Sequence, residues 1–385
     1  MLEIPALDRL IAASPELTEE LKENEKHPYL LHVLLHEVVF GPGLKGGGVV
    51  GRLRKNSSSY KKQMELWGEK RQEVVIESTY PRYARVNLML TTVKDLKLLL
   101  QSTGYVEFTP SKPSRLFPEY LEAVREKEKD SPPMFAEDPL VAHMMLLPPG
   151  MDLHEHPAVV KQWVILQDRA SALPALELHL SGALTPGMTV IDACAAPGNK
   201  TIQLAEVVTA SGSVHACDRD PNRFKTLQRR TLAAGATNIV CHNISFLDID
   251  PEMEPWSQAS CILLDPSCSG SGMRQSSNSP PVKDPKRIQS LSSLQLSLLL
   301  HAMSFPSAKH IVYSTCSLYE EENEQVVSKV LQQSGGLWEL VKAYPEWPMR
   351  GLSTFPVGND CLRASLAATN SIGFFLAHFQ RVARV

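Results

Sequence analysis

The spacing of apolar residues changes twice along the chain, and the two changes divide the sequence into three parts. Residues 1–75 carry apolar residues at helical intervals. Residues 76–155 combine one strand-like alternation, one helical segment and several proline-rich stretches. Residues 156–385 alternate short apolar runs with amphipathic segments of helical length. We therefore predict a helical N-terminal region, a small α+β module and a larger α/β domain.

In the small module, the alternation over 82–90 predicts a strand, and the spacing over 93–104 predicts a helix that stops at a glycine. The prolines around 131–133 and 147–150 predict loops. The helical region before this module has a glycine-rich loop followed by basic residues, which are Lys45, Arg52, Arg54, Lys55, Lys61, Lys62, Lys70 and Arg71. This pattern fits a solvated helix face or a patch that contacts nucleic-acid phosphates, and both interpretations stay open.

The third part has the pattern of a doubly wound, mostly parallel sheet with helices between the strands. Strands are predicted over 189–192, 213–218, 239–242, 261–265, 310–313 and 371–379. Helices are predicted over 200–210, 223–234, 288–303 and 322–333. Right-handed crossovers place the carboxyl ends of such strands along one edge of the sheet, where ligands bind.

Composition narrows the protein class. A net charge of −3 gives no global positive field, so any nucleic-acid surface must be local. No apolar run reaches the roughly 18 residues that a membrane span needs. Seven cysteines without a CxxC pair argue for reduced thiols in an intracellular protein, and against a disulfide framework or zinc module. The pair His154 and His156 lacks further ligands, so no metal is predicted.

The loop Asp192-Ala-Cys-Ala-Ala-Pro-Gly-Asn-Lys-Thr201 follows the first strand of this sheet. Its small residues allow a ligand to approach the backbone, and Gly198 permits a positive φ. The spacing matches neither a Walker loop nor the full GxGxxG motif. Asp218 ends the next strand, where an acid can hold ribose hydroxyls. The two features together predict an adenosyl ligand.

Two further strands end in cysteine-bearing loops, at Cys268 and Cys316, amid serine, threonine, glycine and proline. Such loops expose a sulfur and surround it with donors that lower a thiol pKa. Two thiols at one sheet edge suit covalent activation of a base, since a thiolate that adds to C6 of cytosine makes C5 nucleophilic. Asp265 could assist by hydrogen bonding to the ring. This reasoning leaves open which of the two thiols attacks.

The stretches DACAAPGNKT, LLDPSCSGSGM and VYSTCSLYEEENEQVV resemble motifs I, IV and VI of the Sun/Fmu family of RNA 5-methylcytosine methyltransferases. Similarity extends from about residue 80 to the end. The resemblance implies a Rossmann-like class I methyltransferase domain with RNA-binding modules before it, and S-adenosylmethionine as cofactor. It also implies that Cys316 is the nucleophile, that Cys268 assists product release and that Asp265 contacts the base. The implied cofactor site consists of Cys194, Ala195, Ala196, Pro197, Gly198, Asn199, Lys200, Asp218, Arg223 and Asp265.

The segments LHEHP, ILQDRAS and GLSTFP most resemble the branch of the family whose fifth Sun-domain member acts on large-subunit ribosomal RNA in the nucleolus. The resemblance implies ribosomal RNA as partner and a nucleolar location. A monomer is expected. Two positions depart from the family pattern. Ser267 stands where many members have proline, and Ser245 stands where an acid often follows the third strand.

Other interpretations remain beside this one. The chain could be a non-catalytic RNA-binding assembly factor that retains the methyltransferase fold. An amino-methyltransferase is a weaker alternative, because Asp265-Pro-Ser-Cys268 stands where those enzymes have Asn-Pro-Pro-Tyr. Tyr83 is a candidate for stacking on a base, with core packing favoured for Tyr313 and Tyr319. The acidic run 320–324 is interpreted as charge at a helix N-terminus.

Overall fold

The computed structural model describes residues 4–23, 28–39, 49–66, 81–112, 114, 117–127, 131–274 and 283–383. They group into two compact units, residues 1–75 and 76–385. In the described parts of both units, no helix has the length and apolar character that crossing a membrane requires.

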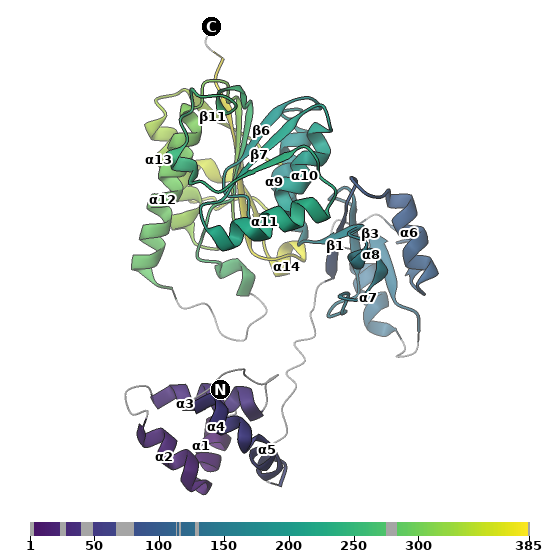
Figure 1. Ribbon diagram of the computed structural model, residues 1–385. Coiled ribbons are helices and arrows are strands. Elements are labelled where there is room, and N and C mark those ends of the chain that lie inside the picture. The colour runs from purple at the N-terminus through teal and green to yellow at the C-terminus, as the bar shows by residue number, and fades with distance from the viewer. Residues whose placement is uncertain are drawn as a thin grey trace. The chain divides into compact units, whose positions relative to one another are not determined.

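The first unit is helical in its described residues (Figure 1). Its helices are α1 (Ile4–Ala13), α2 (Pro15–Glu23), α3 (Pro28–Val39), α4 (Val49–Lys55) and α5 (Ser57–Leu66). Leu10, Leu17 and Leu35 are fully buried and form the centre of an apolar core. Amphipathic helices that pack on one another in this way form a small bundle.

The basic residues of the first unit lie on α4 and α5. Arg52 pairs with Glu20 of α2, whereas the others are exposed, namely Arg54, Lys55, Lys61 and Lys62. Lys45, Lys70 and Arg71 lie outside the described residues. The exposed positions are compatible with both interpretations of this basic segment, so the choice between them stays a prediction.

The second unit begins with a five-stranded sheet in the order β2-β3-β4-β1-β5. Its elements are β1 (Arg82–Val86), α6 (Val93–Ser102), β2 (Val106–Glu107), α7 (Pro118–Glu126), β3 (Met134–Glu137), β4 (Met144–Leu147), α8 (Pro157–Val160) and β5 (Val164–Leu166). The strand predicted over 82–90 ends early, because residues 88–90 form a turn in which the Asn87 side chain accepts from the Met89 amide.

Two sequence interpretations of this region are corrected. The prolines around 131–133 and 147–150 predicted loops, but β3 begins at Met134 and β4 includes Leu147, and the apolar residues of both strands pack in the core. The small sheet also extends past residue 155, where the sequence suggested a boundary, because β5 pairs with β1.

An eight-stranded sheet forms the rest of the second unit, in the order β11-β13-β10-β9-β6-β7-β8 with β12 beside β13. Its strands are β6 (Thr189–Asp192), β7 (Ser213–Cys217), β8 (Ile239–His242), β9 (Cys261–Leu264), β10 (His310–Thr315), β11 (Trp338–Val341), β12 (Leu362–Ala364) and β13 (Phe374–Arg381). Strands β6 to β10 are parallel to one another, whereas β13 pairs antiparallel with β10, β11 and β12. The mostly parallel doubly wound sheet expected from the sequence is confirmed.

Helices cover both faces of this sheet (Figure 1). They are α9 (Arg169–Leu180), α10 (Asn199–Val208), α11 (Pro221–Ala233), α12 (Pro285–Ser304), α13 (Glu324–Gln333) and α14 (Leu366–Thr369). Short 3-10 turns occupy 246–248, 256–258, 271–274, 320–322 and 356–359. Val190 and Leu263 pack with α9 and α10, whereas Ile191 and Leu264 pack with α12 and α13. This alternation buries both faces, as in parallel sheets generally.

Arg85 joins the small sheet to the large domain. Its guanidinium, on β1, is buried and pairs with Glu206 of α10 at 2.6 Å. It also donates to Gln167 Oε1 at 3.0 Å and to the carbonyl of Asn199 at 3.2 Å. Breaking one partner of such a buried pair costs about 3–5 kcal/mol, so this joint holds the two sheets in one arrangement.

Tyr83 lies close to that joint and is buried, with 4% of its surface exposed. Its hydroxyl donates to the Asn370 carbonyl, and its ring packs edge-on against Phe117. A ring held this way cannot receive a base, so the stacking hypothesis for Tyr83 is wrong.

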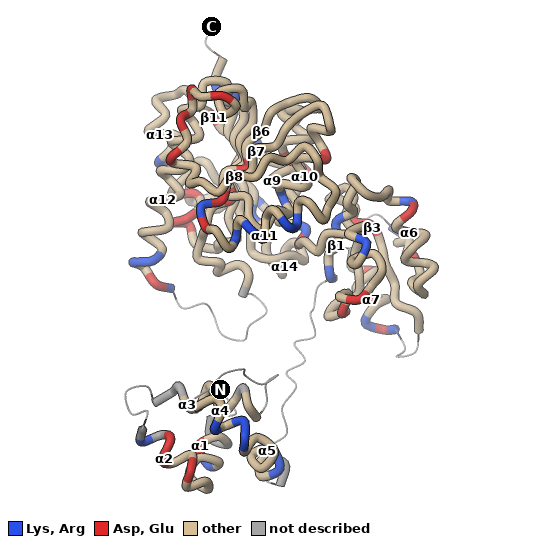
Figure 2. The backbone as a smooth tube through the Cα atoms, in the orientation of Figure 1, with Lys and Arg blue, Asp and Glu red and all other residues tan. Residues whose placement is uncertain are grey.

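Positive charge gathers along α11, where lysine and arginine positions recur (Figure 2). Lys225 and Arg229 stand one helical turn apart and are exposed. Asp220 is the acid at the start of this helix, and it accepts from the amides of Asn222 and Arg223 as a cap. The opposite face buries Leu227 against Ala195 and Ala196 of the loop that follows β6.

Candidate active site

The loop after β6 is shaped by its backbone. Gly198 caps α10 with φ of +106°, a conformation that side chains rarely adopt. A Cβ at this position would lie 3.2 Å from the Leu227 side chain. The Ala195 amide donates to the Cys217 carbonyl at 2.8 Å, which ties the loop to β7. The positive φ therefore favours glycine, and the Leu227 side chain of α11 would have to shift slightly to admit a Cβ.

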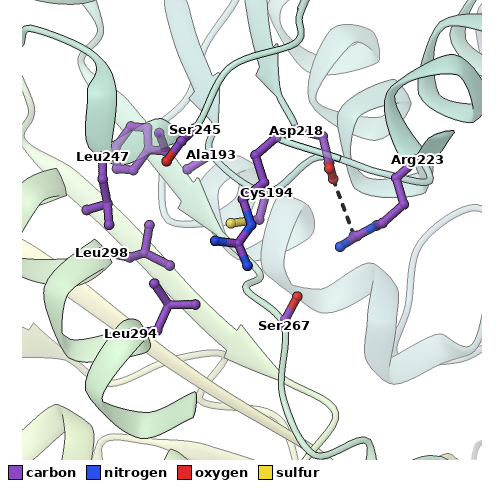
Figure 3. Close-up of a pocket in the computed structure, with 11 residues that line it drawn as sticks. Ala193, Cys194, Asp218, Arg223, Ser245, Leu247, Ser267, Leu294 and Leu298 are labelled. Carbon is purple, nitrogen blue, oxygen red and sulfur yellow. Dashed lines mark ion pairs between the residues drawn. The ribbon is translucent and has the colours of Figure 1, made fainter. Parts of the chain in front are cut away.

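A pocket of about 480 Å³ opens between this loop and α12 (Figure 3). It is lined by Ala193, Cys194, Asp218, Arg219, Arg223, Ser245, Phe246, Leu247, Ser267, Leu294 and Leu298. Leucines form one side and Asp218 with Arg223 the other (Figure 3). A pocket with an apolar wall and a few placed polar groups is typical of small-molecule sites.

Asp218, just after β7, is held by four contacts. Its Oδ2 accepts from the Ala196 amide at 3.3 Å and lies 3.4 Å from Arg223 Nη2, while its Oδ1 accepts from the Asp220 amide at 3.0 Å. The Asn243 side chain donates to its carbonyl at 2.9 Å. The carboxylate therefore has a defined orientation at the pocket wall.

Cys194 contributes a thiol to the same pocket, and this thiol is held in its protonated form. Burial, followed by the charges of Asp192 and Asp265, raises the pKa of this thiol well above its usual value. Burial also raises the pKa of Asp192 to about 7, although Thr201 donates to its Oδ2 at 2.7 Å. A protonated thiol is a poor nucleophile, so Cys194 is suited to packing against a ligand.

Cys268 and Cys316 meet at the ends of two adjacent parallel strands, β9 and β10. Their sulfurs are 3.2 Å apart, within hydrogen-bonding reach for a thiol. The loops are also joined through the backbone, because the Gly272 amide donates to the Cys316 carbonyl at 2.9 Å. The two thiols predicted from the sequence therefore form one site.

The hydrogen bond between the thiols separates their acidities. It lowers the pKa of Cys316 against the opposing effect of burial, and the charge of Lys200 acts in the same direction. It raises the pKa of Cys268, and burial adds to that rise. These directions favour Cys316 as the thiol that ionises and Cys268 as its proton-bearing donor.

Asp265 stands beside the thiols at the end of β9. Its Oδ2 pairs with Lys200 Nζ at 2.7 Å, and its Oδ1 accepts from Ser314 Oγ at 2.7 Å. Lys200 also donates to Ser171 Oγ at 2.9 Å. Lys200, predicted as a cofactor residue, thus lies with Asp265 on the cysteine side of the site.

Two family models match the chain. One, described as 16S rRNA methyltransferase RsmB/F, matches residues 181–380, which is more than half of the sequence. The chain belongs to the RsmB/F methyltransferase family. The other, described as the ferredoxin-like domain of NOL1/NOP2/Sun domain family member 5, matches residues 80–167. The resemblance to Sun-type enzymes that the sequence suggested is confirmed. As a methyltransferase of this family, the protein uses S-adenosylmethionine, as the sequence also predicted.

Curated relatives extend the family match along nearly the whole chain. A mouse protein named 28S rRNA (cytosine-C(5))-methyltransferase is 37% identical over 97% of this chain and 81% of its own length. A 25S rRNA (cytosine-C(5))-methyltransferase from Schizosaccharomyces pombe is 31% identical over the same shares. The solved structure of a methyltransferase homolog from Pyrococcus horikoshii covers 96% of this chain with 22% identity and a TM-score of 0.62, which indicates a shared fold.

In this RsmB/F-family protein, the structure brings some predicted site residues together and separates others. Cys194, Asp218 and Arg223 line the pocket. Ala195, Ala196, Pro197, Gly198 and Asn199 shape the loop behind it without lining it. Ser245 lines the pocket where an acid was expected, and Ser267 lines it just before Cys268.

Sequence reasoning missed the apolar side of the pocket and one carboxylate. Leu294 and Leu298 are one turn apart on α12, a spacing that every amphipathic helix shows and that signals no ligand. Phe246 and Leu247 follow β8 and could have been found from their strand-end position. Glu322, interpreted as helix charge, is fully buried beside the cysteine loops. Outside the site, His156 of the His154–His156 pair caps α8, where its ring accepts from the Ala158 amide at 3.1 Å.

Proposed function

We propose that this protein methylates C5 of a cytosine in large-subunit ribosomal RNA, with Cys316 as nucleophile. The carrying observation is the 3.2 Å contact in which Cys268 lowers the pKa of Cys316. The names of the mouse and Schizosaccharomyces pombe relatives support the choice of substrate. The target cytosine would be turned out of its RNA context to reach a strand-end site of this kind.

The proposed reaction begins when the Cys316 thiolate donates an electron pair to C6 of the cytosine. The C5–C6 π electrons then make C5 nucleophilic, and C5 takes the methyl group. S-adenosylmethionine, when bound, supplies that methyl group as an electrophile. A water molecule then takes the C5 proton, the C5–H electron pair restores the C5–C6 double bond, and the Cys316–C6 bond breaks so that the sulfur leaves as a thiolate.

Cys268 has the properties of a group that assists the last step. Its raised pKa keeps the proton on sulfur, 3.2 Å from Cys316. A hydrogen bond from this thiol stabilises the departing thiolate, because charge-assisted hydrogen bonds are the stronger kind. Without that donor, the covalent complex should persist.

Asp265 and Lys200 are proposed to hold the base. The Asp265 carboxylate oxygens can accept from a cytosine amino group. Lys200, 2.7 Å from that carboxylate, brings positive charge to the place where the activated ring carries extra electron density. Their position next to the thiols supports this assignment.

The pocket beside Asp218 is proposed to hold S-adenosylmethionine, and its residues fit that group. The oriented carboxylate of Asp218 is suited to ribose hydroxyls. Leu294 and Leu298 offer an apolar wall to a planar adenine. Cys194 and Arg223 complete the predicted cofactor set within the pocket.

RNA contact is proposed for the exposed basic face of α11. Lys225 and Arg229 are exposed and form no ion pair within the part of the chain that the structure describes. Cations arranged in this way can neutralise phosphates. A nucleolar location, a monomeric state and the domain boundary near residue 75 are also proposed. Imaging of a tagged protein would test the location, and light scattering would test the monomeric state.

Bisulfite sequencing of large-subunit ribosomal RNA tests the function. Cells that lack the protein should lose one 5-methylcytosine, and wild-type protein but not Cys316→Ala should restore it. The alternative, a non-catalytic assembly factor, predicts that Cys316→Ala also restores it. It further predicts that S-adenosylmethionine does not raise the melting temperature of the purified protein.

A further inference from the structure

Two glutamates of the acidic run 320–324 are fully buried, which the interpretation as helix-end charge did not foresee. Glu324 pairs with Arg363 at 2.6 Å, as a buried charge ordinarily requires. Glu322 differs, because its carboxylate accepts from neutral donors and forms no ion pair among the described residues. A carboxylate in such a place needs several well-placed hydrogen bonds to offset its desolvation.

Those hydrogen bonds come from the two cysteine loops and the helix behind them. The amide of Ser269, the residue after Cys268, donates to Glu322 Oε1 at 2.9 Å. The hydroxyl of Ser317, the residue after Cys316, donates to Glu322 Oε2 at 2.6 Å. Each oxygen of one carboxylate thus holds the neighbour of one thiol.

Gln295 of α12 strengthens this bridge. Its Nε2 donates to Glu322 Oε1 at 3.1 Å and to the carbonyl of Ser267, the residue before Cys268, also at 3.1 Å. The Tyr313 hydroxyl donates to the Glu322 carbonyl at 2.6 Å and anchors the glutamate to β10. Glu322 therefore fixes the backbone on both sides of Cys268, directly at Ser269 and through Gln295 at Ser267.

We propose that Glu322 is a positioning residue that sets the distance between the Cys268 and Cys316 sulfurs. A glutamine in its place has one acceptor oxygen and no charge, so the Ser317 hydroxyl would have to accept instead of donate and the charge-assisted hydrogen bonds to both loops would weaken. The Gly272–Cys316 backbone bond would remain, so the loops would shift rather than unfold. The inference rests on the proposed roles of the two thiols.

The consequence lies in the acidity of Cys316. Cys268 lowers the pKa of Cys316 only while the two sulfurs stay within hydrogen-bonding reach. Loosening the bridge should therefore raise the pKa of Cys316, without any contact between Glu322 and RNA or cofactor. A residue that served folding alone would leave this acidity unchanged.

The test is the pH dependence of Cys316 alkylation by iodoacetamide, followed by peptide mass spectrometry on the full chain. Glu322→Gln should raise the midpoint by about one pH unit, a tenfold loss of thiolate at a fixed pH below it. In the Cys268→Ala background, Glu322→Gln should add nothing, because the bond that it controls is already absent. Glu321→Gln is the matched control, since Glu321 pairs with Lys283 at the surface and should leave the midpoint unchanged.

Methyl transfer gives a second readout. Glu322→Gln should lower kcat about tenfold and leave KM for RNA unchanged, because the residue touches neither substrate. Gln295→Met keeps the side-chain volume and removes both hydrogen bonds of Gln295 but leaves the Ser269 and Ser317 bonds to Glu322, so it should shift the alkylation midpoint less, in the same direction. It also carries the test if Glu322→Gln does not fold.

An unchanged midpoint in the folded variants would overturn the inference. Additive shifts of Glu322→Gln and Cys268→Ala would overturn it as well. A failure of the proposed function is separable from both, since it would appear as full methylation by Cys316→Ala, whatever the alkylation midpoints.

Discussion

Cys194 and Cys316 follow strands at the same edge of the large sheet, and both residues are partly buried. Burial and three aspartates raise the pKa of Cys194. A neighbouring thiol lowers the pKa of Cys316 despite similar burial. The difference shows that the partner of a strand-end cysteine decides its chemistry, whereas its position at the edge does not.

The largest effect is expected from removing the ionising thiol. Cys316→Ala should reduce methyl transfer at least about 10³-fold, because the covalent route is lost. Cys194→Ala should mainly raise the KM for S-adenosylmethionine, because this thiol lines the pocket. The measurement is methyl incorporation into RNA at varied cofactor concentration. A comparable loss of kcat in Cys194→Ala would remove the distinction between the two thiols.

The cofactor side of the comparison depends on Asp218. Asp218→Ala should weaken S-adenosylmethionine binding about 10–100-fold, the value of a lost hydrogen bond to a charged group. Isothermal titration calorimetry measures this loss, and Asp218→Asn should show a smaller one. Cys316 alkylation should not change, so a shifted midpoint in Asp218→Ala would mean that the two sides are coupled.

The cysteine side can be probed through pH. Because Cys268 lowers the pKa of Cys316 in the folded protein, Cys268→Ala should raise it by about one unit. Adduct formation in a single turnover should then require a higher pH, and the rate should recover as pH rises. A profile identical to that of the wild type would show that Cys268 does not control the acidity of Cys316.

The smallest effect concerns the backbone of the cofactor loop. Gly198→Ala should lower the free energy of unfolding by about 1–3 kcal/mol, since φ is +106° and Leu227 is 3.2 Å from the new methyl group. Gly335→Ala is the control, because φ is +60° there and nothing lies within 4 Å. Urea denaturation should show the larger loss for Gly198→Ala. Equal losses would mean that Leu227 moves aside freely.

The sequence predicted the strands that carry this site because period and loop chemistry are local properties. The ranges for β6 and β8 agree with the structure, and Cys268 and Cys316 meet as expected. The strands β3 and β4 were missed, because their apolar runs are short and lie beside prolines.

The roles of Tyr83 and Glu322 could not be predicted, because they depend on contacts between distant segments. Tyr83 bonds to Asn370, and Glu322 receives a hydrogen bond from Ser269, 53 residues away in the chain. The local sequence of Tyr83, beside Arg82 and Arg85, would be the same whether its ring were exposed or buried. Nothing in a run of glutamates distinguishes a surface charge from a carboxylate that bridges two loops.

Covalent trapping on a denaturing gel tests most directly whether Cys316 attacks the base and Cys268 assists its release. Cys268→Ala, incubated with substrate RNA and S-adenosylmethionine, should give a protein–RNA band of reduced mobility, because the Cys316–C6 bond forms and is released slowly. The double variant Cys268→Ala/Cys316→Ala should give no such band. A band that persists in the double variant, or that depends on Cys268 and not on Cys316, would contradict the assignment.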